Sequence, residues 1–360
     1  MNLKSLVVML VLARVFSVGV TLARTNDMKQ LCVNCHTMHN SQGGVAPGGN
    51  VKRGALLNST CYGCHTTDLI TTSNVDGGRP LVLNTSGPVY GLTGTEAGHT
   101  TLAGGDFYWV SVVSDLKGHN VNGIATQSSR IPPGGSATNV FDSSRPLTCA
   151  GINGCHGDLS RTDEIVAMSQ THHAAELSID GSTVARSFRF LNGIAGFEDP
   201  NYELTVTSSD HNQYKGAARS GVEGPLSATI TTISESCARC HGNFHSGSGN
   251  DGVLDGASVA FTDPWIRHPV DYDMGGLGGE YLGYGPSGTY KVATPLGSIN
   301  VTSAIGTVTL NSTIDKNAIV VCVSCHRAHG SPYDYSLRWD YKNWPASGYN
   351  GCGDCHTAKD

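Results

Sequence analysis

The stretch Cys32–His36 reads CVNCH, and its pattern of two cysteines followed by a histidine recurs along the chain. It returns as CYGCH at Cys61–His65, CARCH at Cys237–His241, CVSCH at Cys322–His326 and CGDCH at Cys352–His356. A stretched version, CAGINGCH, runs from Cys149 to His156. These six sites use all twelve cysteines of the 360-residue chain, so the pattern decides which chemistry the sequence can carry.

C-x-x-C-H is the attachment signature of c-type haem. The two thiols add to the vinyl groups of the porphyrin, and the adjacent histidine then reaches the iron. A zinc half-site or a redox dithiol also contains C-x-x-C, but neither needs histidine directly after the second cysteine. We therefore predict six haem c groups. The predicted thioether residues are Cys32, Cys35, Cys61, Cys64, Cys149, Cys155, Cys237, Cys240, Cys322, Cys325, Cys352 and Cys355, and the proximal ligands are His36, His65, His156, His241, His326 and His356.

The third motif departs from the signature, because five residues separate Cys149 from Cys155. A structural disulfide in an exported protein is the competing interpretation of this pair. The unit Cys155-His156 is intact, and no cysteine is left over from the other sites. We therefore predict a haem here too, held by a loop that bulges between the two thiols.

Residues 1–23 combine a basic start at Lys4 with an apolar run of secretory type, which Arg14 interrupts. The small residues Thr21 and Ala23 suit cleavage after position 23. No later stretch approaches the roughly 20 apolar residues that a membrane helix needs. We expect a signal peptide at 1–23, then a single domain at 24–360 that is secreted and has no membrane span.

The composition is that of a loop-rich chain. Charged residues make up only 14%, and 46 of the 360 residues are glycine, well above the usual ~7%. Porphyrins would supply the apolar surface that such a chain lacks. We expect a multihaem cytochrome c fold, mostly irregular, with short helices near the motifs and few short strands wrapped around a continuous haem stack. Strands are expected near 107–113 and 299–310, and helical periodicity is confined to 162–178. The formal net charge of −6 offers no electrostatic basis for nucleic-acid binding.

Histidine count addresses the second axial position of each haem. Six of the fifteen histidines are proximal, which leaves nine for six distal positions. These nine are His39, His99, His119, His172, His173, His211, His245, His268 and His329. Methionine ligation would raise the potential, but only Met38 lies inside a motif region. Histidine on both sides of every iron is the economical interpretation, and it leaves no open iron for a substrate.

Close sequence spacing restricts how these histidines pair. His39 and His329 lie three residues after a proximal histidine, and His245 lies four after one. Two histidines so close in sequence cannot reach opposite faces of one haem, so each must serve a different haem. His172 and His173 are adjacent, and both remain candidates. His99 and His211 are held in reserve.

The motifs and their flanks resemble the hexahaem outer-surface c-type cytochromes of metal-reducing bacteria, the extracellular cytochrome nanowire family. The resemblance is carried by CVNCHTMHNSQGG at 32–44, GGDFYWV at 104–110, KGHNV at 117–121, WIRHP at 265–269, CVSCHRAHG at 322–330 and the C-terminal CGDCHTAKD. These stretches span the chain from 32 to its end. The stretched third motif departs from the family pattern and lacks a histidine shortly after it, a place that His172 or His173 would take.

The resemblance implies one unbroken stack of six haems that polymerises head-to-tail into a conductive extracellular filament. It implies that His39 ligates a haem of the neighbouring subunit, and it supports His119, His245, His268 and His329 as distal ligands. Partners would then be further copies of the chain and extracellular electron acceptors. A non-polymeric shuttle with the same haems is the alternative. A multihaem reductase, which would need one chemically distinct haem site, is a third. We predict an electron-transfer protein, not an enzyme.

Overall fold

The computed structural model describes most of the chain between the first and last motifs. The described residues are 32, 35–39, 41, 53–67, 75–76, 79–90, 100–135, 140–174, 178–219, 230–246, 268–277, 279–281, 284, 287–309, 316–346 and 348–358. The predicted signal peptide at 1–23 lies outside them, as does His99. No helix among these residues is long and apolar enough to cross a membrane.

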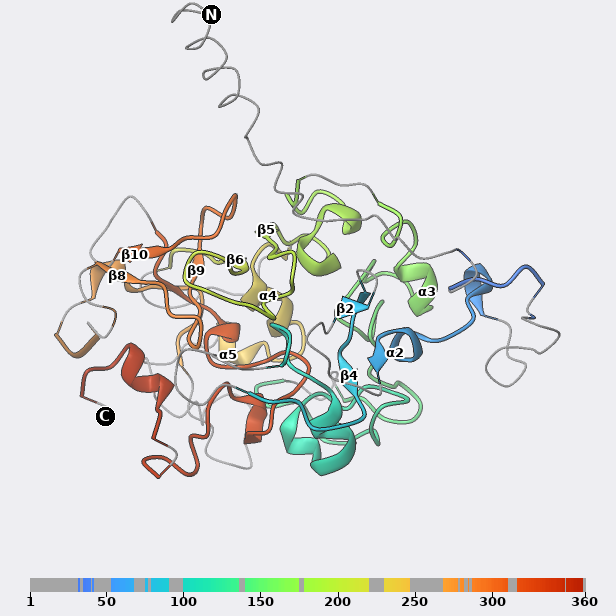
Figure 1. The fold of residues 1–360 in the computed structure, drawn as a ribbon, viewed down its shortest axis with the longest axis horizontal. Helices are drawn as coiled ribbons and strands as arrows, with labels where there is room; N and C mark the ends of the chain where they lie inside the picture. The colour runs from blue at the N-terminus through green and yellow to red at the C-terminus, as the bar shows by residue number, and fades with distance from the viewer. Residues whose placement is uncertain are drawn as a thin grey trace, which may run out of the picture.

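Helices are short and are separated by long irregular segments (Figure 1). The α-helices are α2 (Cys61–Cys64), α3 (Glu164–Ala167), α4 (Ile233–Ala238) and α5 (Asn243–Ser246). The 3-10 turns are η2 (Gly54–Leu56), η4 (Asp115–Lys117), η6 (Val184–Arg186), η7 (Phe188–Phe190), η8 (Met274–Gly276), η9 (Gly279–Tyr281), η10 (Cys322–Ser324), η11 (Asp334–Ser336) and η12 (Gly351–Asp354). Four of these elements, α2, α4, η10 and η12, contain motif cysteines, which confirms the prediction of short helices near the motifs.

Local caps explain why these turns form in a glycine-rich chain. The Thr232 side chain accepts from the backbone N–H of Glu235, and Glu235 closes the reciprocal half of the capping box, which starts α4. Asp163 caps α3, and Thr60 caps α2 directly before Cys61. At α2, α3 and α4 the sequence therefore encodes the start of the turn locally, and a long amphipathic helix is not needed.

Strands are two or three residues long. One sheet has five strands in the order β5 (Gly196–Phe197), β6 (Gln213–Lys215), β9 (Gly297–Ser298), β11 (Ile319–Val320) and β7 (Tyr272–Asp273). In it β6 and β9 are parallel, and the other neighbours are antiparallel. Three two-stranded ladders pair β1 (Thr66–Thr67) with β4 (Leu83–Asn84), β2 (Val75–Asp76) with β3 (Arg79–Pro80), and β8 (Ser287–Thr289) with β10 (Thr307–Thr309).

Three expectations about local structure were wrong in detail. The expected strand at 107–113 is instead a π-helical turn, η3 (Trp109–Val113). The Asp106 carboxylate accepts from the Tyr108 N–H at 2.8 Å and so starts a turn despite the β-branched residues that follow. The expected strand at 299–310 is confined to β10, and the periodicity at 162–178 produces only the four residues of α3.

The five-stranded sheet carries apolar side chains on both faces. Ile319 packs with Phe188, Ile194 and Tyr214 in one cluster, whereas its neighbour Val320 belongs to a second cluster. The second cluster consists of Met274, Tyr284, Tyr290, Leu296, Val308, Ala318 and Val320. Successive side chains of a strand point to opposite faces, so β11 joins the two clusters. Figure 1 places β8 and β10 toward one end of the molecule and α2 and α3 toward the other.

Truncating Ile319 tests the importance of this sheet. Ile319 is fully buried, and Ile319→Ala removes methyl groups that the surroundings cannot replace. We expect the free energy of unfolding to fall by about 2–5 kcal/mol, the range for such core truncations. Guanidinium denaturation followed by circular dichroism measures the loss. A fall below about 0.5 kcal/mol, the range of surface substitutions, would contradict this role.

Candidate haem attachment sites

All five regular motifs close in the same way. The backbone N–H of the histidine donates to the backbone carbonyl of the first cysteine, and this bond closes one helical turn. The closing bonds are His36 to Cys32 at 2.8 Å, His65 to Cys61 at 2.9 Å, His241 to Cys237 at 3.1 Å, His326 to Cys322 at 3.1 Å and His356 to Cys352 at 2.8 Å. This turn places both thiols and the imidazole of one motif around a common centre.

The stretched third motif closes with the same bond. The N–H of His156 donates to the carbonyl of Cys149 at 3.0 Å, and the N–H of Cys155 donates to the same oxygen at 3.2 Å. The extra residues form an excursion between the thiols, which turns at Gly151 with φ +81°. A Cβ on Gly154 would lie 2.6 Å from the Ala150 nitrogen, so only glycine fits there. The thiols are not joined as a disulfide, and the site fits a haem as the regular motifs do.

Arg239, between the two cysteines of the fourth motif, holds this excursion. Its Nη1 donates to the Gly154 carbonyl at 2.7 Å, and its Nη2 donates to the Ile152 carbonyl at 3.3 Å. A planar guanidinium suits two acceptors at once. The third and fourth motifs are therefore fastened to each other through the residues that make the third motif unusual.

Consecutive motifs are neighbours in space in their order along the chain. From each motif, one thiol lies close enough to a thiol of the next for its charge to raise a cysteine pKa. The pairs are Cys35 with Cys64, Cys61 with Cys149, Cys155 with Cys240, Cys237 with Cys322, and Cys325 with Cys355. For Cys61 and Cys237 the largest cause of the raised pKa is the hydrogen bond with the neighbouring thiol. For Cys64, Cys155 and Cys325 the largest cause is burial, and the charge of the neighbouring thiol adds to it.

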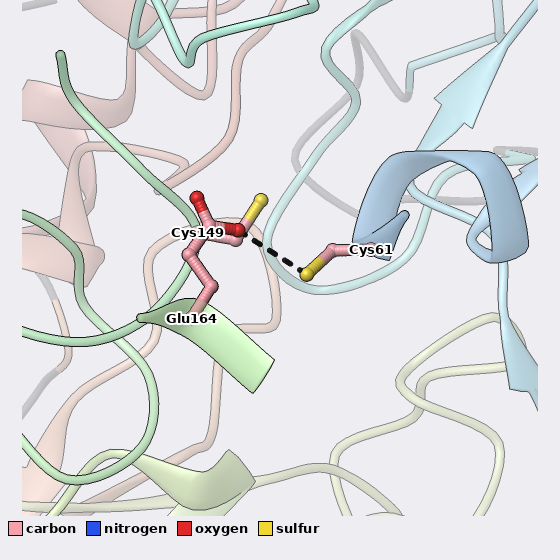
Figure 2. Close-up of side chains that lie close together, drawn as sticks. All are labelled: Cys61, Cys149 and Glu164. Carbon is pink, nitrogen blue, oxygen red and sulfur yellow. Dashed lines mark hydrogen bonds between the residues drawn. The ribbon is translucent and has the colours of Figure 1, made fainter. Parts of the chain in front are cut away.

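Figure 2 shows one of these contacts, where Cys61 and Cys149 converge with Glu164. The Cys61 thiol donates to Glu164 Oε2 at 3.3 Å, and the three possible ligand atoms lie within 4.8 Å of one another. Such a group could hold a metal ion. However, each cysteine is the first thiol of a separate motif with its own second cysteine and histidine. We therefore interpret the group as two attachment loops in contact.

Backbone carbonyls orient five of the six proximal imidazoles. Each Nδ1 lies within hydrogen-bond distance of a carbonyl oxygen, so Nδ1 carries the proton and Nε2 is left as the ligand atom. These contacts are His36 with Ala55 at 2.8 Å, His65 with Pro80 at 2.7 Å, His156 with Arg189 at 2.9 Å, His241 with Pro133 at 2.6 Å and His326 with Tyr335 at 2.8 Å. His356 Nδ1 lies 3.8 Å from Glu280 Oε1.

Five proximal histidines each face one histidine from outside the motifs. The separations of the ring centroids are 6.1 Å for His36 and His173, 6.3 Å for His65 and His172, 6.4 Å for His156 and His329, 6.1 Å for His241 and His119, and 6.3 Å for His356 and His268. Ordinary aromatic pairs span a wider range, about 4.5–7 Å. Here five independent pairs fall between 6.1 and 6.4 Å.

This separation fits an iron between two imidazoles. A metal–imidazole bond is about 2.0 Å long, and the ring centroid lies ~1.1 Å behind the nitrogen, so two rings on opposite sides of one metal have centroids about 6.2 Å apart. A direct stack in the same molecule is much closer: the rings of His211 and Tyr290 lie 3.7 Å apart. The five pairs thus have the spacing expected of two imidazoles on one metal. Packed rings of the same chain can be equally far apart, as Tyr90 and Trp109 are at 6.2 Å, so the distinguishing feature is that the spacing recurs at five motif histidines, each facing one other histidine.

The surroundings favour neutral imidazoles, which is the form that binds metal. Burial, followed by the charges of nearby histidines, lowers the pKa of His172 to about 4 and that of His329 to about 3. Burial also lowers the pKa of His241 to about 4, with His119 as the second cause. These imidazoles are unprotonated near neutral pH and have a free nitrogen lone pair.

His326 and His39 are predicted ligands without a partner of this kind, and His245, described below, is a third. In the described part of the chain, His326 faces no second histidine, although its Nδ1 is fixed like those of the other motifs. His39 is exposed and faces no motif histidine among the same residues. Among the described residues, His326 therefore lacks a facing histidine, and His39 is an exposed histidine that faces no motif histidine.

His245 and His211 lie elsewhere. His245 is buried, with its Nε2 3.0 Å from Asp271 Oδ2, and it faces no motif histidine among the described residues. Asp271 also accepts from the Thr232 hydroxyl at 2.6 Å. His211 is buried against Tyr290. The structure thus brings His119, His172, His173, His268 and His329 to motif histidines, and it gives His245 and His211 hydrogen-bonding and packing contacts instead.

Similarity to known proteins agrees with these sites. A family profile described as the doubled CXXCH motif matches residues 316–360, which contain the fifth and sixth motifs. The matched profile and the attachment turns make this part of the chain similar to multihaem c-type cytochromes. The particular protein to which the chain is similar is the C-type cytochrome OmcS of Geobacter sulfurreducens, with 25% identity over 357 positions that cover 86% of this chain and 78% of OmcS. The resemblance inferred from the motifs is thereby confirmed.

Two solved structures from the same organism also match. One is an Outer Membrane Cytochrome S filament, with a TM-score of 0.43, 17% identity and coverage of 86% of this chain and 83% of that chain. The other is the OmcS nanowire, with a TM-score of 0.43, 19% identity and coverage of 87% and 84%.

Sequence reasoning missed the contacts that orient the ligands. The carbonyl acceptors of Pro80 and Pro133, and the clamp from Arg239, have no signature of their own, because backbone carbonyls are present at every residue. For adjacent His172 and His173 only the structure shows that both face motif histidines, those of neighbouring sites. Contact between the thiols of those two sites makes this arrangement consistent.

Replacing His245 separates a ligand role from a structural one. His245→Ala removes a donor from the buried Asp271 carboxylate, so we expect the free energy of unfolding to fall by about 1–3 kcal/mol. The low-spin haem signal of the purified holoprotein should stay unchanged in its optical and EPR spectra. His245→Gln, which keeps an N–H donor, is the matched control and should recover part of the stability. A new high-spin haem in both variants would show that His245 is a ligand after all.

Arg239→Ala tests the clamp between the third and fourth motifs. This variant loses two charge-assisted hydrogen bonds to the excursion. We expect the free energy of unfolding to fall by at most about 1.5–3 kcal/mol for each lost bond. Arg239→Lys keeps the charge but not the fork, and it should recover only part of the loss. Guanidinium denaturation of the two holoproteins measures this difference. Equal stability of Arg239→Ala and the unsubstituted protein would disprove the clamp.

Proposed function

We propose that this chain carries six haem c groups and transfers electrons along them without transforming a substrate. The observation that carries the proposal is the set of five histidine pairs at 6.1–6.4 Å, each with one motif histidine. Bound haem iron supplies one-electron redox chemistry, and a histidine on each side of the iron leaves no position for a substrate. This disfavours a reductase.

The order of the motifs supports one continuous row. Thiols of each motif approach thiols of the next, from Cys35 and Cys64 at the first step to Cys325 and Cys355 at the last. Porphyrins attached at these thiols would lie edge to edge or face to face. The chain's own contribution is to hold the attachment turns in place, and the buried residues Val320 and Val321 anchor the chain directly before Cys322.

His39 and His326 supply the contact between subunits. Five motif histidines face a second histidine within the chain, whereas His326 of the fifth motif faces none among the described residues. If His39 of one subunit takes the open position opposite His326 of the next, every subunit both gives and receives one ligand. Such a heterologous contact forms a filament when it does not close into a ring. The similarity to OmcS supports this assembly, and the predicted signal peptide at 1–23 supports export of the chain.

A discrete electron shuttle with the same haems is the second candidate. It is favoured by one observation: His326 and His39 are both exposed and would bind water or another ligand in a monomer. The two candidates differ only in the fate of these two histidines. Assembly state is therefore the measurement that separates them.

His39→Ala is the decisive variant. We expect it to retain six covalent haems but to form no filaments in electron micrographs, because the contact loses its coordination bond. One haem in six should lose its second histidine and give a high-spin or water-bound signal. Added imidazole should return that haem to the low-spin state without restoring filaments. Normal filaments from His39→Ala would overturn the proposal, and a fully low-spin monomer would favour the discrete shuttle.

A further inference from the structure

The segment that carries His39 is held by a neighbouring turn. The N–H of Thr37 donates to the Leu56 carbonyl at 2.8 Å, and the N–H of Asn58 donates to the Cys35 carbonyl at 2.8 Å. His36 and Leu57 form an isolated antiparallel bridge between these two contacts. The residues before His39 are therefore fixed to the stretch 53–58.

That turn in turn rests on α3. A Cβ on Gly54 would lie 3.2 Å from Ile165 Cγ2, so η2 and α3 are in close contact. Ala55 and Leu56 both have positive φ, a tight conformation that turns η2 back toward the motif. His39 is thus presented from three joined elements: the first motif, η2 and α3.

These three elements expose apolar side chains. Met38 is 82% exposed, Leu56 is 45% exposed and Val166 in α3 is 47% exposed. A single exposed apolar residue needs no explanation. Here one such side chain comes from each of three elements that touch one another, and His39 directly follows Met38 in the chain.

We infer that Met38, Leu56 and Val166 form a docking platform around His39. On it a second copy of this chain would dock with the surface around its own His326. This rests on the proposed function, which assigns His39 to that position. Met38 is bonded to His39, so any surface that receives His39 must also meet Met38. A second copy is the occupant because the chain holds both halves of the incomplete site: a donor at His39 and an acceptor at His326.

The platform has a purpose that coordination alone does not serve. One metal–ligand bond fixes a distance but leaves rotation about the bond free. Apolar contacts on either side of His39 would fix the orientation of the incoming subunit and so keep the rows of neighbouring subunits in line. The rigid hold on Thr37 makes such orientation effective, since a flexible arm would transmit none.

The test uses charged substitutions in the holoprotein. Met38→Asp, Leu56→Asp and Val166→Asp place charge in the contact but leave His39 and all attachment motifs unchanged. We expect each to raise the protein concentration for half-maximal assembly at least about tenfold, as loss of a buried apolar side chain would. Sedimentation and electron microscopy measure assembly. Met38→Gln should also raise the concentration needed for assembly, whereas Met38→Leu should assemble like the unsubstituted protein.

Val112→Asp is the matched control, because Val112 is an exposed apolar residue of η3, 64% accessible. Assembly by this control at the normal concentration, with impaired assembly by the three platform variants, supports the inference. Normal assembly by the platform variants overturns it, as does equal impairment of Val112→Asp. The proposed function has its own separate test, the assembly and spin state of His39→Ala, which the platform variants leave untouched. Unchanged low-spin spectra from the five internal histidine pairs would verify that each variant is folded.

Discussion

An imidazole has two ring nitrogens, and in this protein one of them is committed to the backbone. Once the Nδ1 of a motif histidine donates to a carbonyl such as that of Pro80 or Arg189, Nε2 can point in only one direction. The attachment turn fixes where that histidine stands relative to its two thiols. In the proposed sites, a second histidine about 6 Å away would supply the other ligand along that direction. The irregular chain is organised around this repeated constraint rather than around a sheet or a bundle.

The same constraint explains how a loop-rich chain remains ordered. The four described α-helices are at most six residues long, and the largest sheet is built from strands of two or three residues. Caps such as Thr232–Glu235 and close contacts such as Gly154 on Ala150 set each local turn. Apolar clusters form on the two faces of β11, which leads directly to the fifth motif through Val321. Packing therefore supports the attachment turns, and these turns in turn fix the positions of the motif histidines.

What could be predicted from the sequence is what spacing encodes. C-x-x-C-H fixes the thiols and proximal histidines because all five residues are contiguous, and the glycine content indicates short elements. Pairing across long distances is not encoded in that way. His245 illustrates the limit: its position four residues after His241 resembles that of a distal ligand, yet the fold buries it against Asp271, which follows it by 26 residues. The prediction of a strand at 107–113 was wrong for a related reason. The β-strand propensity of valine counts for little where Asp106 starts a turn and where none of the described strands pairs with this segment.

The position of the two unmatched histidines bears on how subunits would meet. His39 lies three residues beyond the first motif, whereas His326 belongs to the fifth, and the motifs follow one another in space in chain order. A closed two-fold dimer would need both His39–His326 contacts at once, with two rows lying side by side from the first motif to the fifth. The exposed apolar residues Met38, Leu56 and Val166 do not follow the row in that way, because they gather on elements beside the first two motifs, at the end where Figure 1 places α2 and α3. A contact concentrated at one end of a row favours end-to-end addition, in which each new subunit offers its own fifth motif to the next.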